Sequence, residues 1–338
     1  MAGGFLSCLQ IFSSSDILDK YGRCMSRIIL CMALFLGIVN TAEAADPIAL
    51  KTDGGELCGT LEVPKGAHAV PVALIISGSG PTDKDGNNSL AGKNNSLKML
   101  AEGLAAKGIA SLRYDKRGIA ESAAAGPNEA DLRFDTYIED AEGWGRLLLQ
   151  DRRFTKLIIV GHSEGSLIGA VACRRLGAQG FISIAGVGYP AFEVLETQLK
   201  KNLPPDLLSE SNRILDLLKA GTTTDKVPSS LMILFRPSVQ PYLISWFRYD
   251  PVLEVSRLTA PTLIVQGTTD VQVSTSDAER LAKSNKLARL LLIEGMNHVL
   301  KSVPGDPGLQ MKSYGDPDLP VSQELVDKIG AFIREVSN

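Results

Sequence analysis

The sequence predicts an α/β fold in which helices cover both faces of a mostly parallel sheet. Short apolar runs alternate along the chain with segments of helical periodicity, and runs such as Leu157–Val160 are apolar at every position. Strands that are buried on both faces of a parallel sheet have this continuous apolar character. The 338 residues, of which 44% are hydrophobic and 22% charged, can build a sizeable core.

Residues 1–44 are predicted to be a leader and signal peptide rather than part of the fold. Basic residues precede the apolar run Ile28–Val39, and the small-residue cleavage site Ala-Glu-Ala follows at 42–44. The run is too short for the ~30 Å hydrocarbon core of a bilayer. The alternatives to a signal peptide are an uncleaved anchor and a plain hydrophobic helix. Synthesis starts either at Met1 or at Met25. The pattern indicates a secreted or periplasmic protein with no stable membrane span after cleavage.

Residues 45–188 are predicted to form the first part of the core domain. Apolar runs bounded by turn residues predict strands, and longer amphipathic segments predict helices. The predicted strands are Val70–Ile76, Ile109–Tyr114, Leu157–Val160 and Phe181–Ala185, and the predicted helices are Leu97–Lys107, Phe134–Gln150 and Ser166–Leu176.

A helical cap is predicted over residues 189–250, where the alternation stops. This segment is rich in leucine, contains Pro204-Pro205 and has no strand pattern. The alternation then resumes through strand Ala260–Val265, helix Asp277–Ser284, strand Arg289–Ile293 and helix Ser322–Val336. The core domain is therefore predicted to comprise 45–188 and 251–338, with the cap inserted before the penultimate strand.

The pentapeptide Gly161-His162-Ser163-Glu164-Gly165 lies between a predicted strand and a predicted helix. In this context G-x-S-x-G indicates a nucleophile elbow, a sharp turn that presents the serine hydroxyl above the sheet edge. Glycine is favoured on both sides of the turn because side chains would collide there. We expect His162 to point away from the site. The alternative is a glycine-rich turn with an incidental serine.

A serine nucleophile needs a base, and an elbow serine takes a histidine that follows the last strand, with an acid before it in the order Ser, Asp, His. Of the three histidines, His68 precedes the elbow and His162 is inside it, which leaves His298. Asp270 ends the turn after the penultimate strand and is the predicted acid. Asp277, in the following helix, is the rival.

The oxyanion of an acyl-transfer intermediate needs two backbone donors. The N–H of Glu164, directly after the nucleophile, is the first prediction. The N–H of Ser79, in the Ser77–Pro81 turn, is the second, with Gly80 as the alternative donor. A turn that is merely flexible is the other reading of this segment.

Three further segments carry a resemblance to a known family. These are Gly78-Ser79-Gly80-Pro81-Thr82-Asp83-Lys84-Asp85-Gly86-Asn87, Arg113–Gly118 with Glu121-Ser122, and Gln240–Trp246 with Tyr249-Asp250-Pro251. Over residues 47–336 the chain resembles serine hydrolases of the α/β-hydrolase superfamily, and in particular secreted bacterial carboxylesterases with a GSGPxDxDGN oxyanion loop and a helical cap. The resemblance implies that fold, the Ser-His-Asp triad and carboxylesterase activity.

The predicted function is therefore cleavage of carboxylic esters through an acyl-enzyme. A serine peptidase or amidase with the same triad is the alternative, and a non-catalytic binding protein on this fold is a third possibility. The predicted partner is a small-molecule ester. The net charge of −3 offers no basic field for nucleic acid. The oligomeric state stays open.

No cofactor or metal is predicted, because no histidine and carboxylate cluster has ligand spacing and no glycine-rich phosphate loop occurs. After cleavage of the leader, Cys58 and Cys173 remain, as buried small residues or as a single bridge. Asp115 and Arg117 are expected to shape their loop through an ion pair.

Overall fold

The structure is a computed structural model that describes residues 44–338. The predicted leader and signal peptide, with its start site and apolar run, lies outside the described residues except for Ala44, with which β1 begins. Among the residues described, none of the helices has both the length and the apolar character needed to cross a bilayer.

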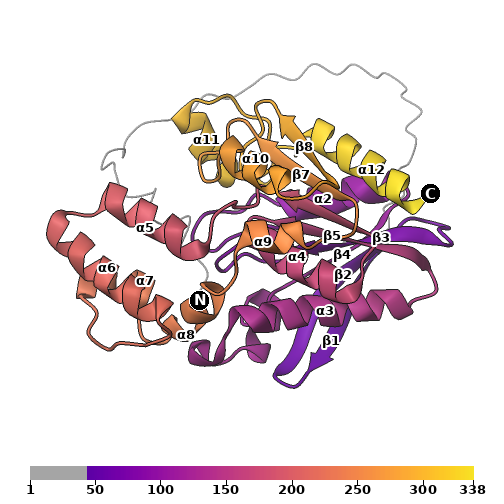
Figure 1. Cartoon of the computed structure of the whole chain (residues 1–338). Helices are drawn as coiled ribbons and strands as arrows, with labels where there is room; N and C mark the ends of the chain where they lie inside the picture. Colours follow the sequence, from indigo (N-terminus) through magenta and orange to yellow (C-terminus); the bar gives the residue numbers. More distant parts are fainter. Residues whose placement is uncertain (1–43) are drawn as a thin grey trace, which may run out of the picture.

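One twisted sheet forms the centre of the described part of the chain (Figure 1). Its eight strands have the order β1-β2-β4-β3-β5-β6-β7-β8. β2 is antiparallel to both β1 and β4, and every other neighbouring pair is parallel. The strands are β1 Ala44–Thr52, β2 Gly55–Val63, β3 Val70–Ile76, β4 Ala110–Tyr114, β5 Phe154–His162, β6 Gly180–Ile184, β7 Thr262–Gly267 and β8 Ala288–Ile293. The predicted mostly parallel sheet is confirmed.

Helices pack on both faces of this sheet, as predicted, because alternate residues of its central strands point to opposite sides. Leu74 of β3 belongs to a buried cluster with helices α3, α4 and α10. Its neighbour Ile75 belongs to a second cluster with helices α2 and α12. The bounds are α2 Ser96–Ala105, α3 Phe134–Gln150, α4 Glu164–Leu176, α10 Thr275–Lys283 and α12 Gln323–Ser337.

Four helices lie between β6 and β7 in the segment predicted as the cap, and Figure 1 shows them to one side of the sheet. They are α5 Ala191–Asn202, α6 Pro205–Lys219, α7 Met232–Phe235 and α8 Gln240–Trp246, and α9 Pro251–Ser256 leads back into the core. The ring of Trp246 stacks on Phe134 of α3 with ring centroids 5.8 Å apart. Apolar side chains of α5 to α8 belong to the same buried cluster as those of α3, so the four helices share a core with the sheet.

The sequence did not predict strands β1 and β2, which form the first hairpin, and it did not predict helix α11 (Pro307–Tyr314). Cys58 on β2 and Cys173 on α4 are both free thiols, so the bridge that the sequence left open is not formed.

Candidate active site

Ser163 lies at the sharp turn between β5 and α4, with a positive φ of 54°. Its backbone N–H donates to Ile184 O at 2.9 Å, which fixes the turn against β6. A Cβ on Gly161 would lie 2.2 Å from Gly165 O, and a Cβ on Gly165 would lie 2.3 Å from Ile76 O. Both positions therefore require glycine, because backbone atoms leave no room for a side chain.

His298 and Asp270, which are far apart in the sequence, form a hydrogen bond of 2.8 Å between Nδ1 and Oδ2. The carboxylate can only accept, so Nδ1 carries the hydrogen, and in the neutral ring Nε2 keeps its lone pair. The other carboxylate oxygen accepts the backbone N–H groups of Gln272 and Val273 at 2.8 and 3.0 Å. Asp277, the rival acid, instead caps α10 through Ser274.

Burial alone would raise the pKa of the Asp270 carboxyl. The imidazole of His298 and the two backbone N–H groups outweigh burial and hold this pKa below its usual value. Asp270 is therefore ionised at neutral pH and can stabilise a positive charge on His298.

Three cavities have Ser163 in their lining: one of about 20 Å³ beside Leu167 and Trp246, and two that are larger. Of these two, the smaller cavity has a volume of about 50 Å³, and its lining includes Ser79 and His298 together with the serine. The larger, of about 500 Å³, extends from Ser163 along α5. Its lining residues are mixed apolar and polar: Val187, Tyr189, Glu193, Val194, Thr197, Gln198, Gln272, Val273 and Asp277. The arrangement leaves room for a substrate on two sides of the serine.

The expectation that His162 points away from the site is wrong. Its ring packs against His298 with centroids 4.9 Å apart, and it lines the smaller cavity. Its Nε2 lies 2.8 Å from the His298 carbonyl oxygen, which can only accept, so Nε2 donates. Burial, with His298 beside it, lowers the pKa of His162 to about 3. His162 is therefore neutral at neutral pH and supports the loop that carries His298.

We expect His162→Phe to lower kcat for an ester about fivefold and the free energy of unfolding by about 1 kcal/mol. The phenyl ring keeps the packing, but the His298 carbonyl loses its donor, and one such hydrogen bond contributes about this much. Ester turnover and urea unfolding check the two values. A loss of activity as large as that of a Ser163 variant would instead assign His162 a role in proton transfer.

The loop after β3 is held by acidic side chains. Asp83 Oδ1 accepts the backbone N–H groups of Asp85 and Asn87 at 2.9 and 2.8 Å. Asp85 also forms an ion pair with Arg113 of β4 at 2.8 Å. Because Ser79 belongs to the same loop, these contacts fix its position opposite the elbow.

The expected ion pair between Asp115 and Arg117 is not formed. Asp115 pairs with Lys84 at 3.0 Å, and Arg117 pairs with Asp140 of α3 at 2.6 Å. Each side chain therefore joins its loop to another part of the molecule rather than to the neighbouring residue.

The side chain of Glu164 is a feature that the sequence analysis missed, since only its backbone N–H was assigned a role. The carboxylate is 1% exposed and forms an ion pair of 3.0 Å with Lys116. Its other oxygen accepts the hydroxyl of Tyr242 on α8 at 2.5 Å. An acidic residue between two apolar segments, Leu157–Val160 and Leu167–Ala172, was the available signal that it needed a buried partner.

Within residues 44–338, His, Cys, Asp and Glu do not form a group of three or more that could hold a metal ion.

Known proteins resemble this chain in sequence and in fold. Residues 90–241 match the family model described as serine aminopeptidase, S33. The esterase EstD of Thermotoga maritima is 30% identical over 252 residues, which are 74% of this chain and 59% of EstD. The chain thus matches less than two thirds of the length of that relative.

Two solved structures share the architecture. Est1E from Butyrivibrio proteoclasticus has a TM-score of 0.56 at 16% identity, covering 87% of this chain and 99% of its own. The esterase domain of a Rhodothermus marinus protein has a TM-score of 0.54 at 16% identity, covering 87% of this chain and 100% of its own. At these identities the likeness shows a common fold.

Proposed function

Because the chain has the α/β-hydrolase fold, we propose that it is a serine hydrolase that cleaves carboxylic esters through an acyl-enzyme. The observation that carries the proposal is the hydrogen bond between Asp270 and His298 Nδ1, which leaves Nε2 free. His298 lines the same cavity as Ser163, whose backbone is strained at a positive φ. These are the parts that activate a serine hydroxyl. The similarity to esterase EstD supports an ester rather than another acyl substrate.

In this mechanism Ser163 Oγ attacks the acyl carbonyl while His298 Nε2 takes its proton. Asp270 stabilises the imidazolium, and the N–H groups of Ser79 and Glu164 bind the tetrahedral oxyanion. His298 then protonates the leaving alcohol as the C–O bond breaks. Water attacks the acyl-enzyme by the same route, which releases the acid and restores the serine.

The cavities support an assignment of the two halves of the ester. His298 must lie next to the alcohol oxygen that it protonates, and it lines the smaller cavity. The alcohol is therefore assigned to that side, where Asn88, Asn94 and Ser96 add polar groups. The acyl chain is assigned to the cavity of about 500 Å³ along α5, which includes three valines in its lining.

We expect kcat/KM for p-nitrophenyl esters to rise severalfold per methylene from acetate to a chain of about four to eight carbons. Each buried methylene contributes about 0.8 kcal/mol until the cavity is filled. Initial rates across the series from acetate to decanoate check the trend. Acetate as the best substrate would contradict the assignment of the larger cavity to the acyl chain.

A serine peptidase or amidase with the same triad is the second candidate, because the matched family model describes an aminopeptidase. Aminoacyl p-nitroanilides tested beside the matched p-nitrophenyl esters separate the two. Labelling of Ser163 by a fluorophosphonate without turnover of either set would favour a different acyl substrate. Failure to label would favour the non-catalytic binding protein.

We also propose that the protein acts outside the cytoplasm on a small-molecule ester. The basic, apolar and small-residue pattern that ends at residues 42–44 supports export. Cell fractionation followed by N-terminal sequencing of the mature chain tests this location.

A further inference from the structure

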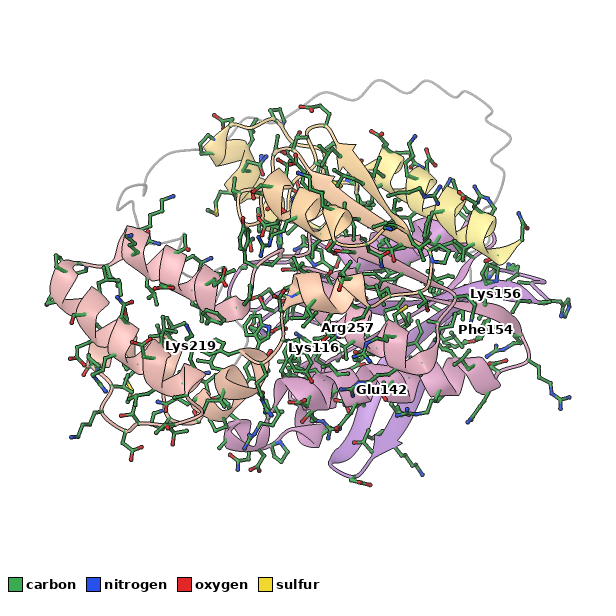
Figure 2. The ribbon with its side chains drawn as sticks, in the orientation of Figure 1. Lys116, Glu142, Phe154, Lys156, Lys219 and Arg257 are labelled. Carbon is green, nitrogen blue, oxygen red and sulfur yellow. The ribbon has the colours of Figure 1, made fainter. Side chains whose placement is uncertain are left out.

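Lys116 carries a buried positive charge close to the proposed oxyanion donors. It follows β4, and Figure 2 shows it in the interior, where the helices of the cap segment approach the rest of the chain. Its side chain is 2% exposed. The ammonium donates to Gly78 O at 2.6 Å and to Glu164 Oε2 at 3.0 Å. A buried ammonium is tolerated only with such partners.

The contact with Gly78 fixes a peptide group rather than a side chain. Gly78 C=O and Ser79 N–H belong to one planar trans peptide, so they point in opposite directions. When Lys116 holds the carbonyl on the interior side, the Ser79 N–H points the other way. Ser79 lines the cavity that Ser163 and His298 share.

The next peptide of the loop is held as well, because Ser79 O accepts the hydroxyl of Thr82 at 2.7 Å. A Cβ on Gly78 would lie 3.1 Å from Ser163 Cβ, which shows how closely the loop approaches the nucleophile. At this distance a rotated peptide would remove the N–H from the oxyanion or turn a carbonyl toward it.

Glu164 connects this lysine to the second donor. Its backbone N–H is the other proposed oxyanion donor, and its carboxylate binds Lys116. One ion pair therefore joins the backbone segments of both donors. The same carboxylate accepts the hydroxyl of Tyr242 on α8.

We propose that Lys116 is a positioning residue for the oxyanion hole, which holds the Gly78–Ser79 peptide in the orientation that presents the Ser79 N–H to the transition state. This inference rests on the proposed serine-hydrolase mechanism. Since a preformed donor acts on charge that develops in the transition state, its misalignment lowers kcat more than it raises KM.

Lys116→Met tests the proposal, with Tyr242→Phe as the matched control. Methionine fills the space of the lysine stem without its charge, whereas Tyr242→Phe removes the other hydrogen bond to Glu164 and leaves the Gly78 contact. We expect Lys116→Met to lower kcat about 100-fold, with KM changed less than about threefold. Tyr242→Phe is expected to change kcat less than about fivefold.

A second readout excludes a purely structural role. A trifluoromethyl ketone forms a tetrahedral oxyanion on the serine, so its affinity is expected to fall by the same factor as kcat/KM, about 100-fold. An equal loss of kcat in both variants, or an unchanged affinity for the ketone, would overturn the proposal. Lys116→Met leaves the buried carboxylate of Glu164 without its ion-pair partner. The double variant Lys116→Met with Glu164→Gln removes this charge and is expected to show the same losses of kcat and of affinity for the ketone.

Measurements on the wild-type protein distinguish failure of the positioning role from failure of the proposed function. If it hydrolyses esters and depends on Ser163, while Lys116→Met is as fast as wild type, only the positioning role fails. If it hydrolyses no ester, the rate of fluorophosphonate labelling still reports on the activated serine. A labelling rate that does not fall in Lys116→Met would then refute the positioning role.

Discussion

Replacing Ser163 with alanine is expected to abolish turnover and leave the protein folded. The substitution removes the oxygen that would form the proposed acyl-enzyme, and loss of a triad nucleophile costs at least about 10⁴-fold in kcat. Alanine tolerates the φ of 54° no worse than serine does, so the free energy of unfolding should change by less than about 1 kcal/mol. Hydrolysis of a p-nitrophenyl ester and urea unfolding measure both.

Ser166→Ala provides the matched control for this experiment. Ser166 lies in the first turn of α4, directly after the elbow, and its hydroxyl is 2.6 Å from that of Ser183 rather than facing either cavity. It is expected to lose stability and to keep most of its turnover. Ester hydrolysis by Ser163→Ala above the background rate of the assay would contradict the proposed mechanism.

Asp270→Asn is expected to lower kcat by about 10⁴-fold. One side-chain oxygen still accepts the backbone N–H groups of Gln272 and Val273, so the amide nitrogen faces His298 Nδ1. That nitrogen donates, which moves the ring hydrogen to Nε2, where it blocks acceptance of the serine proton. The steady-state rate at neutral pH measures the loss.

Asp277→Asn is the control for the acid, because it tests the rival residue. This variant disturbs the capping box of α10 and is expected to cost about 1 kcal/mol of stability with kcat lowered severalfold at most. A larger loss of kcat in Asp277→Asn than in Asp270→Asn would reverse the assignment.

The stability of wild type relative to Asp270→Asn is also expected to depend on pH. The folded state holds the pKa of Asp270 below its usual value. The carboxylate therefore stabilises the fold fully above about pH 3.9, the value in an unfolded chain, and this contribution is lost as pH falls through the folded pKa. Urea unfolding of both proteins between neutral pH and the acid range measures the difference.

The elements that the sequence predicted best are those buried on both sides. β3, β5 and β6 are central strands with continuous apolar runs, and they were placed with small differences at their ends. The β1–β2 hairpin was missed because it lies at the edge of the sheet, where partly exposed strands carry polar residues on one face. A continuous apolar run is absent there.

The proposed triad could be read from the sequence because its chemistry limits the choice. With three histidines in the chain, only His298 follows the last strand. The partners of Lys116 and Arg117 could not be read in this way. They depend on how the loop after β4 meets α3, α4 and the loop after β3, and no local spacing specifies that packing.

The stack of Trp246 on Phe134 and the hydroxyl of Tyr242 on Glu164 have a consequence for redesign by recombination. A chimera that replaces residues 189–250 with a foreign segment loses, in one step, the ring that covers α3 and the donor to the elbow carboxylate. To transfer substrate preference between relatives, residues 189–250 and the α3 positions that contact them must therefore be exchanged together.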